Sequence, residues 1–144
     1  MKRLSLLCVV LCIFIVSFTE VCANIQVKYL RCEMLVNPVG IASRTPRLTW
    51  EITSASRDVH QTAYRILVAS SEENLNSGIS DLWDSGKVKS DQSVYIPYAG
   101  KILKSRDKCY WKVKVYTNKG TSGWSSPARW SLGLINESDW QAKW

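Results

Sequence analysis

The sequence is poor in the residues that most often carry chemistry. Its 144 residues include one histidine, His60, and only two of its five cysteines, Cys32 and Cys109, lie outside the first 23 residues. These three residues have no close spacing, so they do not predict a zinc site. There is no glycine-rich phosphate loop, and no run of like charge is longer than two residues. We therefore expect no metal, no other cofactor and no nucleic-acid partner.

The first 23 residues have the pattern of a secretory signal peptide. Lys2 and Arg3 form a short positive region, and residues 4–18 are apolar except for two serines. Val21-Cys22-Ala23 then offers a site for cleavage after Ala23. The alternative is a membrane anchor, but the apolar run of about 15 residues is shorter than the roughly 20 that a spanning helix needs. We expect export to a periplasmic or extracellular location, with no stable membrane span after cleavage.

Export would place Cys32 and Cys109 in a compartment where disulfides persist. Cys109 falls on the inward phase of a predicted strand. Two alternatives stay open: a disulfide across the core, or two small buried thiols. We interpret the net charge of +7 as an aid to solubility and to attraction at surfaces, because an exported protein rarely meets nucleic acid.

Apolar and polar residues alternate along several stretches, which is typical of half-buried strands. The strongest is residues 61–70, where Tyr64, Ile66 and Val68 share one face and Leu67 keeps the other face partly apolar. We expect this strand to be central. The other predicted strands are residues 25–35, 47–52, 82–84, 94–98, 109–116 and 128–132.

In two of these stretches the alternation predicts which side chains point toward the core. In residues 47–52, Leu48, Trp50 and Ile52 point inward, while Arg47, Thr49 and Glu51 point outward. In residues 109–116, the odd-numbered residues point inward, and Lys112 and Lys114 point to water. One helical turn is predicted after Ser71, which can cap it.

About seven strands, with turns roughly every ten residues, predict an all-β fold. The expected architecture is an antiparallel β-sandwich of the immunoglobulin or fibronectin type III kind, spanning residues 24–135. Residues 136–144 are expected to begin a linker to a downstream domain.

Six strings, taken in order, resemble the N-terminal module of bacterial α-L-rhamnosidases. They are Asn37-Pro38-Val39-Gly40-Ile41, Pro46-Arg47-Leu48-Thr49-Trp50, the stretch 61–70, Leu82-Trp83-Asp84-Ser85-Gly86-Lys87-Val88, Tyr110-Trp111-Lys112-Val113-Lys114-Val115, and Trp130-Ser131-Leu132-Gly133-Leu134 with Asp139-Trp140-Gln141-Ala142-Lys143-Trp144. The resemblance implies part of an exported, inverting glycosidase that releases terminal L-rhamnose from plant glycosides or polysaccharides. It also implies that the catalytic carboxylates lie in a downstream helical barrel, so no catalytic residue is assigned here.

Seven tryptophans are the remaining candidates for a binding role. Trp50, Trp111 and Trp130 fall on inward phases and are predicted to be core. The other four, which we consider for contacts with a sugar or with a neighbouring domain, are Trp83, Trp124, Trp140 and Trp144. The first hypothesis is a non-catalytic scaffold module that contacts the downstream domains of a rhamnosidase. The second is a stand-alone carbohydrate-binding module that recognises rhamnose-containing glycans through Trp83 or Trp124. A third, that the chain is itself catalytic, lacks a carboxylate pair at a recognisable spacing.

Overall fold

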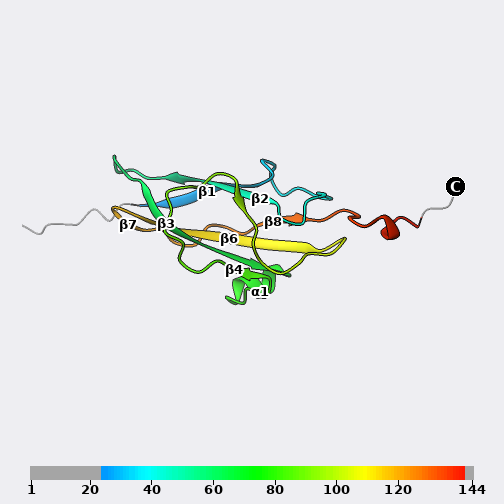
Figure 1. Ribbon diagram of the computed structural model, residues 1–144. Coiled ribbons are helices and arrows are strands. Elements are labelled where there is room, and N and C mark those ends of the chain that lie inside the picture. The colour runs from blue at the N-terminus through cyan, green and yellow to red at the C-terminus, as the bar shows by residue number, and fades with distance from the viewer. Residues whose placement is uncertain (1–23, 142–144) are drawn as a thin grey trace, which may run out of the picture.

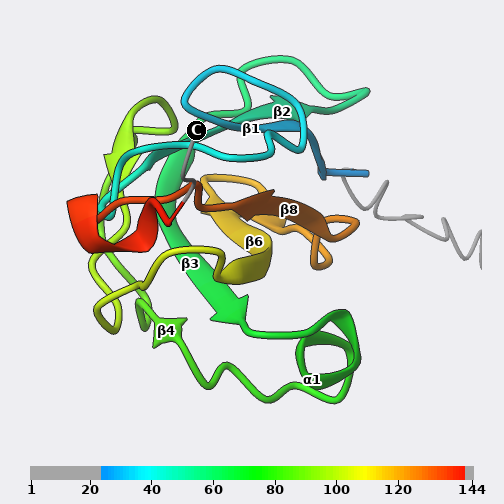
Figure 2. The same cartoon turned by 90° about the vertical axis from the view of Figure 1, so that its right-hand side faces the viewer.

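The computed structural model describes residues 24–141, and this part of the chain forms two antiparallel sheets (Figures 1 and 2). The predicted signal peptide, residues 1–23, lies outside the described residues, as does Trp144. The three-stranded sheet has the order β1 (Gln26–Cys32), β2 (Arg47–Thr53), β5 (Ile96–Pro97). The five-stranded sheet has β4 (Trp83–Asp84), β3 (Gln61–Ala69) and β6 (Lys108–Thr117) side by side, with β7 (Gly120–Thr121) and β8 (Ala128–Ser131) both paired to β6.

This arrangement confirms the predicted all-β sandwich, with eight strands among residues 24–141. It also confirms the predicted central strand, which spans residues 61–69, since β3 pairs with β4 on one side and with β6 on the other. Two short helical turns complete the described chain, α1 (Glu72–Asn76) and η1 (Glu137–Asp139). The hydroxyl of Ser71 caps α1 by accepting from the backbone N–H of Asn74 at 3.1 Å, as the sequence predicted.

Side chains from both sheets meet in one hydrophobic core. Trp50, Trp111 and Trp130 are each at most 1% exposed, which confirms their predicted inward phase. Their rings meet others edge to face: Trp111 and Trp130 have centroids 6.5 Å apart, and Trp50 and Tyr64 have centroids 5.2 Å apart. Each such pair adds about 1 kcal/mol to the stabilisation that burial itself provides. The core therefore depends on aromatic rings from β2, β3, β6 and β8.

The outward prediction for Thr49 is wrong, because this residue is only 6% exposed. Its hydroxyl accepts from the backbone N–H of Tyr95 at 3.1 Å and lies 3.7 Å from the sulfur of Met34. Loops that are distant in sequence therefore cover the outer face of β2. The predictions for Arg47 and Glu51, which are exposed, are confirmed.

The turn at residues 37–41 covers the edge of β8 that does not pair with β6. The backbone N–H of Arg129 donates to the Asn37 side-chain oxygen at 2.9 Å, and the N–H of Ser131 donates to the Pro38 carbonyl at 3.1 Å. Gly40 has φ = 75°, a conformation that glycine adopts without strain. Because an uncovered edge strand can pair with another chain, this turn protects the sandwich from edge-to-edge association.

No helix within residues 24–141 has the length and apolar character needed to cross a membrane.

Candidate binding surfaces

The tryptophan candidates outside the core differ in how much of each ring is free. Trp83 is half-buried, packs against the core, and meets Tyr98 edge to face at 5.4 Å. Trp124 is 37% exposed and Trp140 is 67% exposed. The structure therefore separates them: Trp83 is mainly a packing residue, whereas Trp124 and Trp140 present surface to solvent, in different parts of the molecule.

Trp124 projects from a short segment that continues the sheet edge beyond β7. The backbone N–H groups of Ser122 and Ser125 donate to the carbonyls of Val115 and Val113, both at 2.9 Å. The two serine hydroxyls in turn accept from the N–H groups of the same valines, at 3.0 and 3.1 Å. Buried serines thus complete the hydrogen bonding at the edge of β6, and Trp124 between them is directed to the outer face of the sheet.

Lysine ammonium groups lie over two aromatic rings of this face, the exposed Trp124 and the half-buried Tyr116. The Lys112 and Lys114 nitrogens are 5.4 and 5.9 Å from the centre of the Trp124 ring. The Lys87 nitrogen is 4.0 Å from the centre of the Tyr116 ring. All three distances are within the range of cation–π attraction. We call these five residues the β6 outer face.

Lys112 differs from the other two lysines because it is partly structural. Its ammonium donates to the Leu75 carbonyl of α1 at 2.7 Å, and burial lowers its pKa from the ordinary lysine value. The prediction that Lys112 points to water is therefore only partly right. Lys114 lies on the same face, paired across the strands with Arg65. The guanidinium of Arg65 is engaged by the Asp84 carboxylate at 2.6 and 2.9 Å.

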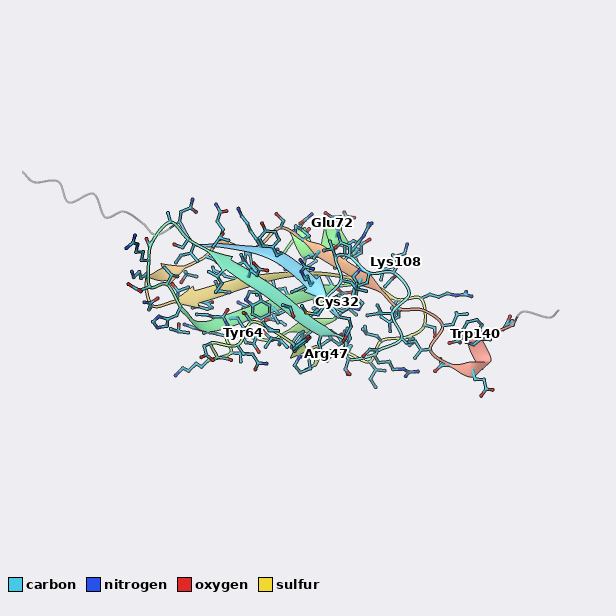
Figure 3. All side chains as sticks on the ribbon, turned by 90° about the horizontal axis from the view of Figure 1, so that it is seen from above. Cys32, Arg47, Tyr64, Glu72, Lys108 and Trp140 are labelled. Atoms are coloured by element: carbon cyan, nitrogen blue, oxygen red, sulfur yellow. The ribbon has the colours of Figure 1, made fainter. Side chains whose placement is uncertain are left out.

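The second exposed tryptophan, Trp140, follows η1 at one end of the molecule, beyond the two sheets (Figure 3). The Asp139 carboxylate accepts from the Ser105 hydroxyl and, at 3.0 Å, from the backbone N–H of Asn136. The Ser105 hydroxyl accepts from the N–H of Ile135 at 2.8 Å. These hydrogen bonds, chiefly the one from Ser105, lower the pKa of Asp139. The segment is therefore tied to a core loop while the Trp140 ring stays free.

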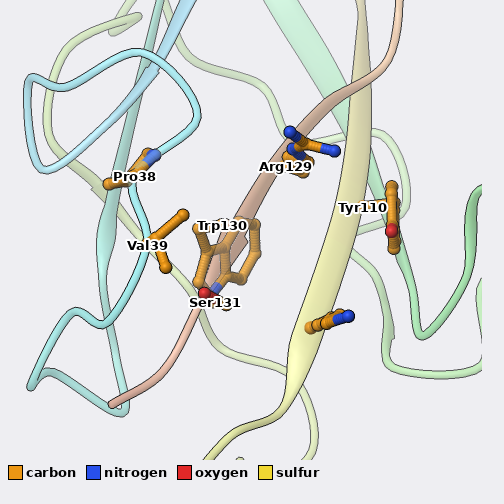
Figure 4. Close-up of a pocket in the computed structure, with 7 residues that line it drawn as sticks. Pro38, Val39, Tyr110, Arg129, Trp130 and Ser131 are labelled. Atoms are coloured by element: carbon orange, nitrogen blue, oxygen red, sulfur yellow. The ribbon is translucent and has the colours of Figure 1, made fainter.

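A small pocket beside β8 is lined by residues that the sequence did not single out for binding. Its lining residues are Pro38, Val39, Lys108, Tyr110, Arg129, Trp130 and Ser131, shown in Figure 4. None of them is a carboxylate, so the pocket cannot supply the paired acid and base that glycoside hydrolysis requires. It brings together none of the four candidate tryptophans.

Groups for metal or nucleophilic chemistry are not clustered in the described part of the chain. Residues 24–141 contain no group of three or more histidine, cysteine or acidic side chains that could hold a metal ion. His60 is exposed just before β3. Cys32 and Cys109 are free, buried thiols that belong to the same core but to different sheets. Burial raises the pKa of both thiols to about 12, so both stay protonated at neutral pH. The structure thus has the two thiols unbridged, the second of the alternatives left open by the sequence. The disulfide stays a prediction for the exported protein, which intact mass with and without reductant would test.

Comparison with known proteins identifies the family. Residues 27–136 match the family described as Rha78A-like, N-terminal immunoglobulin domain. The chain belongs to this family. Over 113 residues it is 45% identical to an α-L-rhamnosidase of Streptomyces avermitilis, covering 78% of this chain and 11% of that enzyme. An α-L-rhamnosidase of Formosa agariphila is 43% identical over 110 residues, covering 75% of this chain and 12% of that protein.

Solved structures agree with this assignment. The crystal structure of the Streptomyces avermitilis enzyme, complexed with L-rhamnose, superposes with a TM-score of 0.79 at 43% identity, covering 84% of this chain and 12% of that one. The α-L-rhamnosidase of Dictyoglumus thermophilum has the same TM-score at 37% identity, with coverage of 83% and 13%. This Rha78A-like domain therefore corresponds to a small part of much larger proteins, which confirms the resemblance found in the sequence.

Sequence reasoning identified Trp124 but missed what surrounds it. The alternation Lys112-x-Lys114 was an available signal for a positive stripe on one strand face. Lys87 and Tyr116 could not be placed beside it, because the loop that carries Lys87 reaches β6 only in the folded structure.

Proposed function

We propose that this Rha78A-like domain is a non-catalytic accessory module of an exported α-L-rhamnosidase, which it helps to hold together as a scaffold. The observation that carries the proposal is coverage: the domain matches rhamnosidases at 45% and 43% identity but spans only 11–12% of their length. The partners would be the downstream domains of such an enzyme. The leader-like pattern of residues 1–23 supports export.

Four carboxylates within residues 24–141 have structural roles, which support a non-catalytic function. Asp84 binds Arg65, Glu33 binds Arg47, and Asp81 accepts hydrogen bonds from Ser70. Asp139 caps η1. An inverting glycosidase needs two carboxyls about 6.5–9.5 Å apart across a cleft, one of them held protonated. None of these four has the raised pKa that such an acid requires. Hydrogen bonds lower the pKa of Glu33, Asp84 and Asp139. Burial alone would raise the pKa of Asp81, but its hydrogen bonds from Ser70 leave that pKa lowered.

Two measurements test the accessory role. The purified protein should release no nitrophenol from 4-nitrophenyl α-L-rhamnoside, and release at an enzymatic rate would contradict the proposal. Deleting the corresponding domain from a rhamnosidase that carries it should lower the melting temperature of that enzyme. The deletion should leave turnover by the remaining folded enzyme within a few-fold. An unchanged melting temperature would argue against a scaffold role.

A second candidate function, sugar recognition, is favoured by one observation: the Trp124 ring is exposed on the outer face of the five-stranded sheet. A stand-alone carbohydrate-binding module that recognises rhamnose-containing glycans could use this ring. Titration with rhamnosides would then shift the tryptophan fluorescence, and a Trp124→Ala variant would lose the shift. No shift up to millimolar sugar would eliminate this candidate.

A further inference from the structure

The β6 outer face combines three cations with two aromatic rings on one side of the five-stranded sheet. Lys112, Lys114 and Tyr116 alternate along β6. Trp124 and Lys87 come from segments on either side of that strand: Trp124 follows β7, whose neighbour is β6, and Lys87 follows β4, on the side of β3. None of these five residues belongs to the hydrophobic core, and the face is separate from the end of the molecule that carries Trp140.

The positive charge of this face is not neutralised by its neighbours. Within residues 24–141 the side-chain ion pairs are Glu33–Arg47 and Arg65–Asp84. Arg65 lies opposite Lys114 on the neighbouring strand. The nearby Asp84 carboxylate is hydrogen-bonded to Arg65, so its negative charge does not neutralise Lys114. Cations that are close together and unpaired raise the local concentration of an anionic ligand.

The ammonium groups of this face lie over its two aromatic rings, although part of the Trp124 ring stays exposed. Two ammonium nitrogens lie over Trp124 and one lies over Tyr116, at 4.0–5.9 Å from the ring centres. A neutral sugar that stacked on these rings would have to displace the lysines. An anionic group can instead accept hydrogen bonds from the ammonium groups where they are, and such charge-assisted hydrogen bonds are stronger than neutral ones.

We propose that the β6 outer face binds an anionic polysaccharide, through carboxylate or sulfate groups that contact Lys87 and Lys114. A folded protein partner fits the face less well, because protein interfaces are centred on buried apolar anchors and depleted of lysine. Trp124 is the one large apolar side chain of this face that is more than one-third exposed. A hydrated, flexible polyanion needs no such anchor. The inference goes beyond the scaffold role and does not depend on it.

The test is direct binding of the purified protein to four soluble polymers at about 50 mM salt. Polygalacturonate carries carboxylates, dextran sulfate carries sulfates, dextran is neutral, and poly-L-glutamate represents an acidic protein surface. We expect polygalacturonate or dextran sulfate to bind, and dextran to fail. Comparing these two polyanions distinguishes a carboxylate ligand from a sulfate ligand. Binding should weaken steeply between about 50 and 200 mM salt, because salt screens exposed charges over about 10 Å at 0.1 M.

A matched pair of variants localises the site. Lys87→Gln with Lys114→Gln removes two charges from the β6 outer face and leaves the structural contact of Lys112 intact. Lys28→Gln with Lys104→Gln removes two charges from exposed lysines on β1 and in the loop before β6. We expect about a tenfold loss of affinity in the first double variant and less than a twofold loss in the second. Far-ultraviolet circular dichroism of both variants checks that they are folded.

Three outcomes would overturn the inference. Equal losses in the two double variants would show that binding follows net charge and not this face. Poly-L-glutamate binding as tightly as the best polysaccharide would assign the face to an acidic protein surface. No binding of any charged polymer would leave the lysines without a ligand of this class. None of these results bears on the scaffold role, which is measured by deleting the domain from a rhamnosidase.

Discussion

Gln61 shows how a single buried polar residue can organise several loops. Its side-chain oxygen accepts from the Trp50 indole N–H at 3.0 Å, and its nitrogen donates to the carbonyls of Ser90 and Gln92 at 3.0 and 2.8 Å. Gln61 is only 5% exposed. The residue therefore connects β2 to the loop before β5 through three hydrogen bonds.

Replacing Gln61 by leucine should lower the free energy of unfolding by about 3 kcal/mol, because it leaves a buried indole N–H and two carbonyls without partners. Urea denaturation followed by tryptophan fluorescence measures the change. Gln26→Leu, at an exposed glutamine of β1, is the matched control and should stay within about 0.5 kcal/mol of the native chain. Equal effects in the two variants would show that the Gln61 network does not stabilise the fold.

A second prediction at the residue scale concerns Asp84 in the Arg65–Asp84 ion pair. It is about how the free energy of unfolding changes with pH. The hydrogen bond from Arg65 is the main cause that lowers the pKa of Asp84 below its ordinary value. The contribution of the Asp84 carboxylate to the free energy of unfolding is therefore fully present above the pKa that Asp84 has in the unfolded chain, near 3.9. It is lost as the pH falls through the lowered folded pKa. The pair is partly exposed, so its contribution at pH 7 is below about 1 kcal/mol.

Asp84→Asn should accordingly be slightly less stable than the native chain at pH 7, and the gap should close between about pH 5 and pH 2. Urea denaturation at a series of pH values measures the gap. Asp91→Asn removes the same charge from an exposed loop and serves as the control. A gap for Asp84→Asn that stays constant down to pH 2 would contradict the assignment.

Among the connections between strands, the loop after β5 packs closely against β4 at Gly100. A Cβ atom there would lie 2.5 Å from the Leu82 carbonyl oxygen, the Trp83 Cβ and the Tyr98 hydroxyl. Gly100→Ala should therefore lower the free energy of unfolding by about 2 kcal/mol, as overpacking usually does. Gly123, where a Cβ would meet nothing within 4 Å, is the control.

Gly123→Ala makes the same chemical change at an open position. It should leave stability within about 0.5 kcal/mol, or raise it slightly by restricting the unfolded chain. Thermal unfolding of the two variants side by side is the measurement. If Gly100→Ala is tolerated as well as Gly123→Ala, the close packing of the loop after β5 against β4 is wrong.

The elements that could be predicted from the sequence are those whose burial follows a local period. β6 alternates from Cys109 to Val115, and each odd-numbered residue is buried because the strand alone determines its side. Thr49 has the same local pattern but the opposite outcome, since Met34 and Tyr95 cover it from distant loops. The alternation of residues along β2 cannot predict that residues from other loops cover Thr49.

The candidate surfaces show the same limit. Trp83 and Trp124 are alike in sequence, each in a loop-rich region between short strands. Only the fold buries part of one ring against Tyr98 and places the other under two lysines. The sequence therefore predicted which residue type to examine, while the packing of distant segments decided which tryptophan is exposed.

At the scale of the whole molecule, the described chain begins and ends at opposite ends of the sandwich (Figure 1). The C-terminal end carries Trp140, whose backbone is held by the capping box of η1 and by the Ser105–Asp139 hydrogen bond. A large ring that is 67% exposed on an anchored segment contributes little to the stability of this domain. Under the proposed scaffold role, such a ring suits a contact with a downstream domain, because aromatic residues are enriched in interfaces.

This arrangement predicts that Trp140→Ala has different effects in the isolated chain and in a full-length enzyme. In the isolated chain the substitution should change the free energy of unfolding by less than about 0.5 kcal/mol, as at other exposed positions. In a rhamnosidase that carries this domain, the same change should lower the melting temperature of the enzyme by several degrees, because a buried aromatic anchor typically contributes about 2 kcal/mol or more. Differential scanning calorimetry of both pairs measures the difference. A small effect in both settings would remove Trp140 from the interface, while a large effect in both would make it a structural residue of the domain itself.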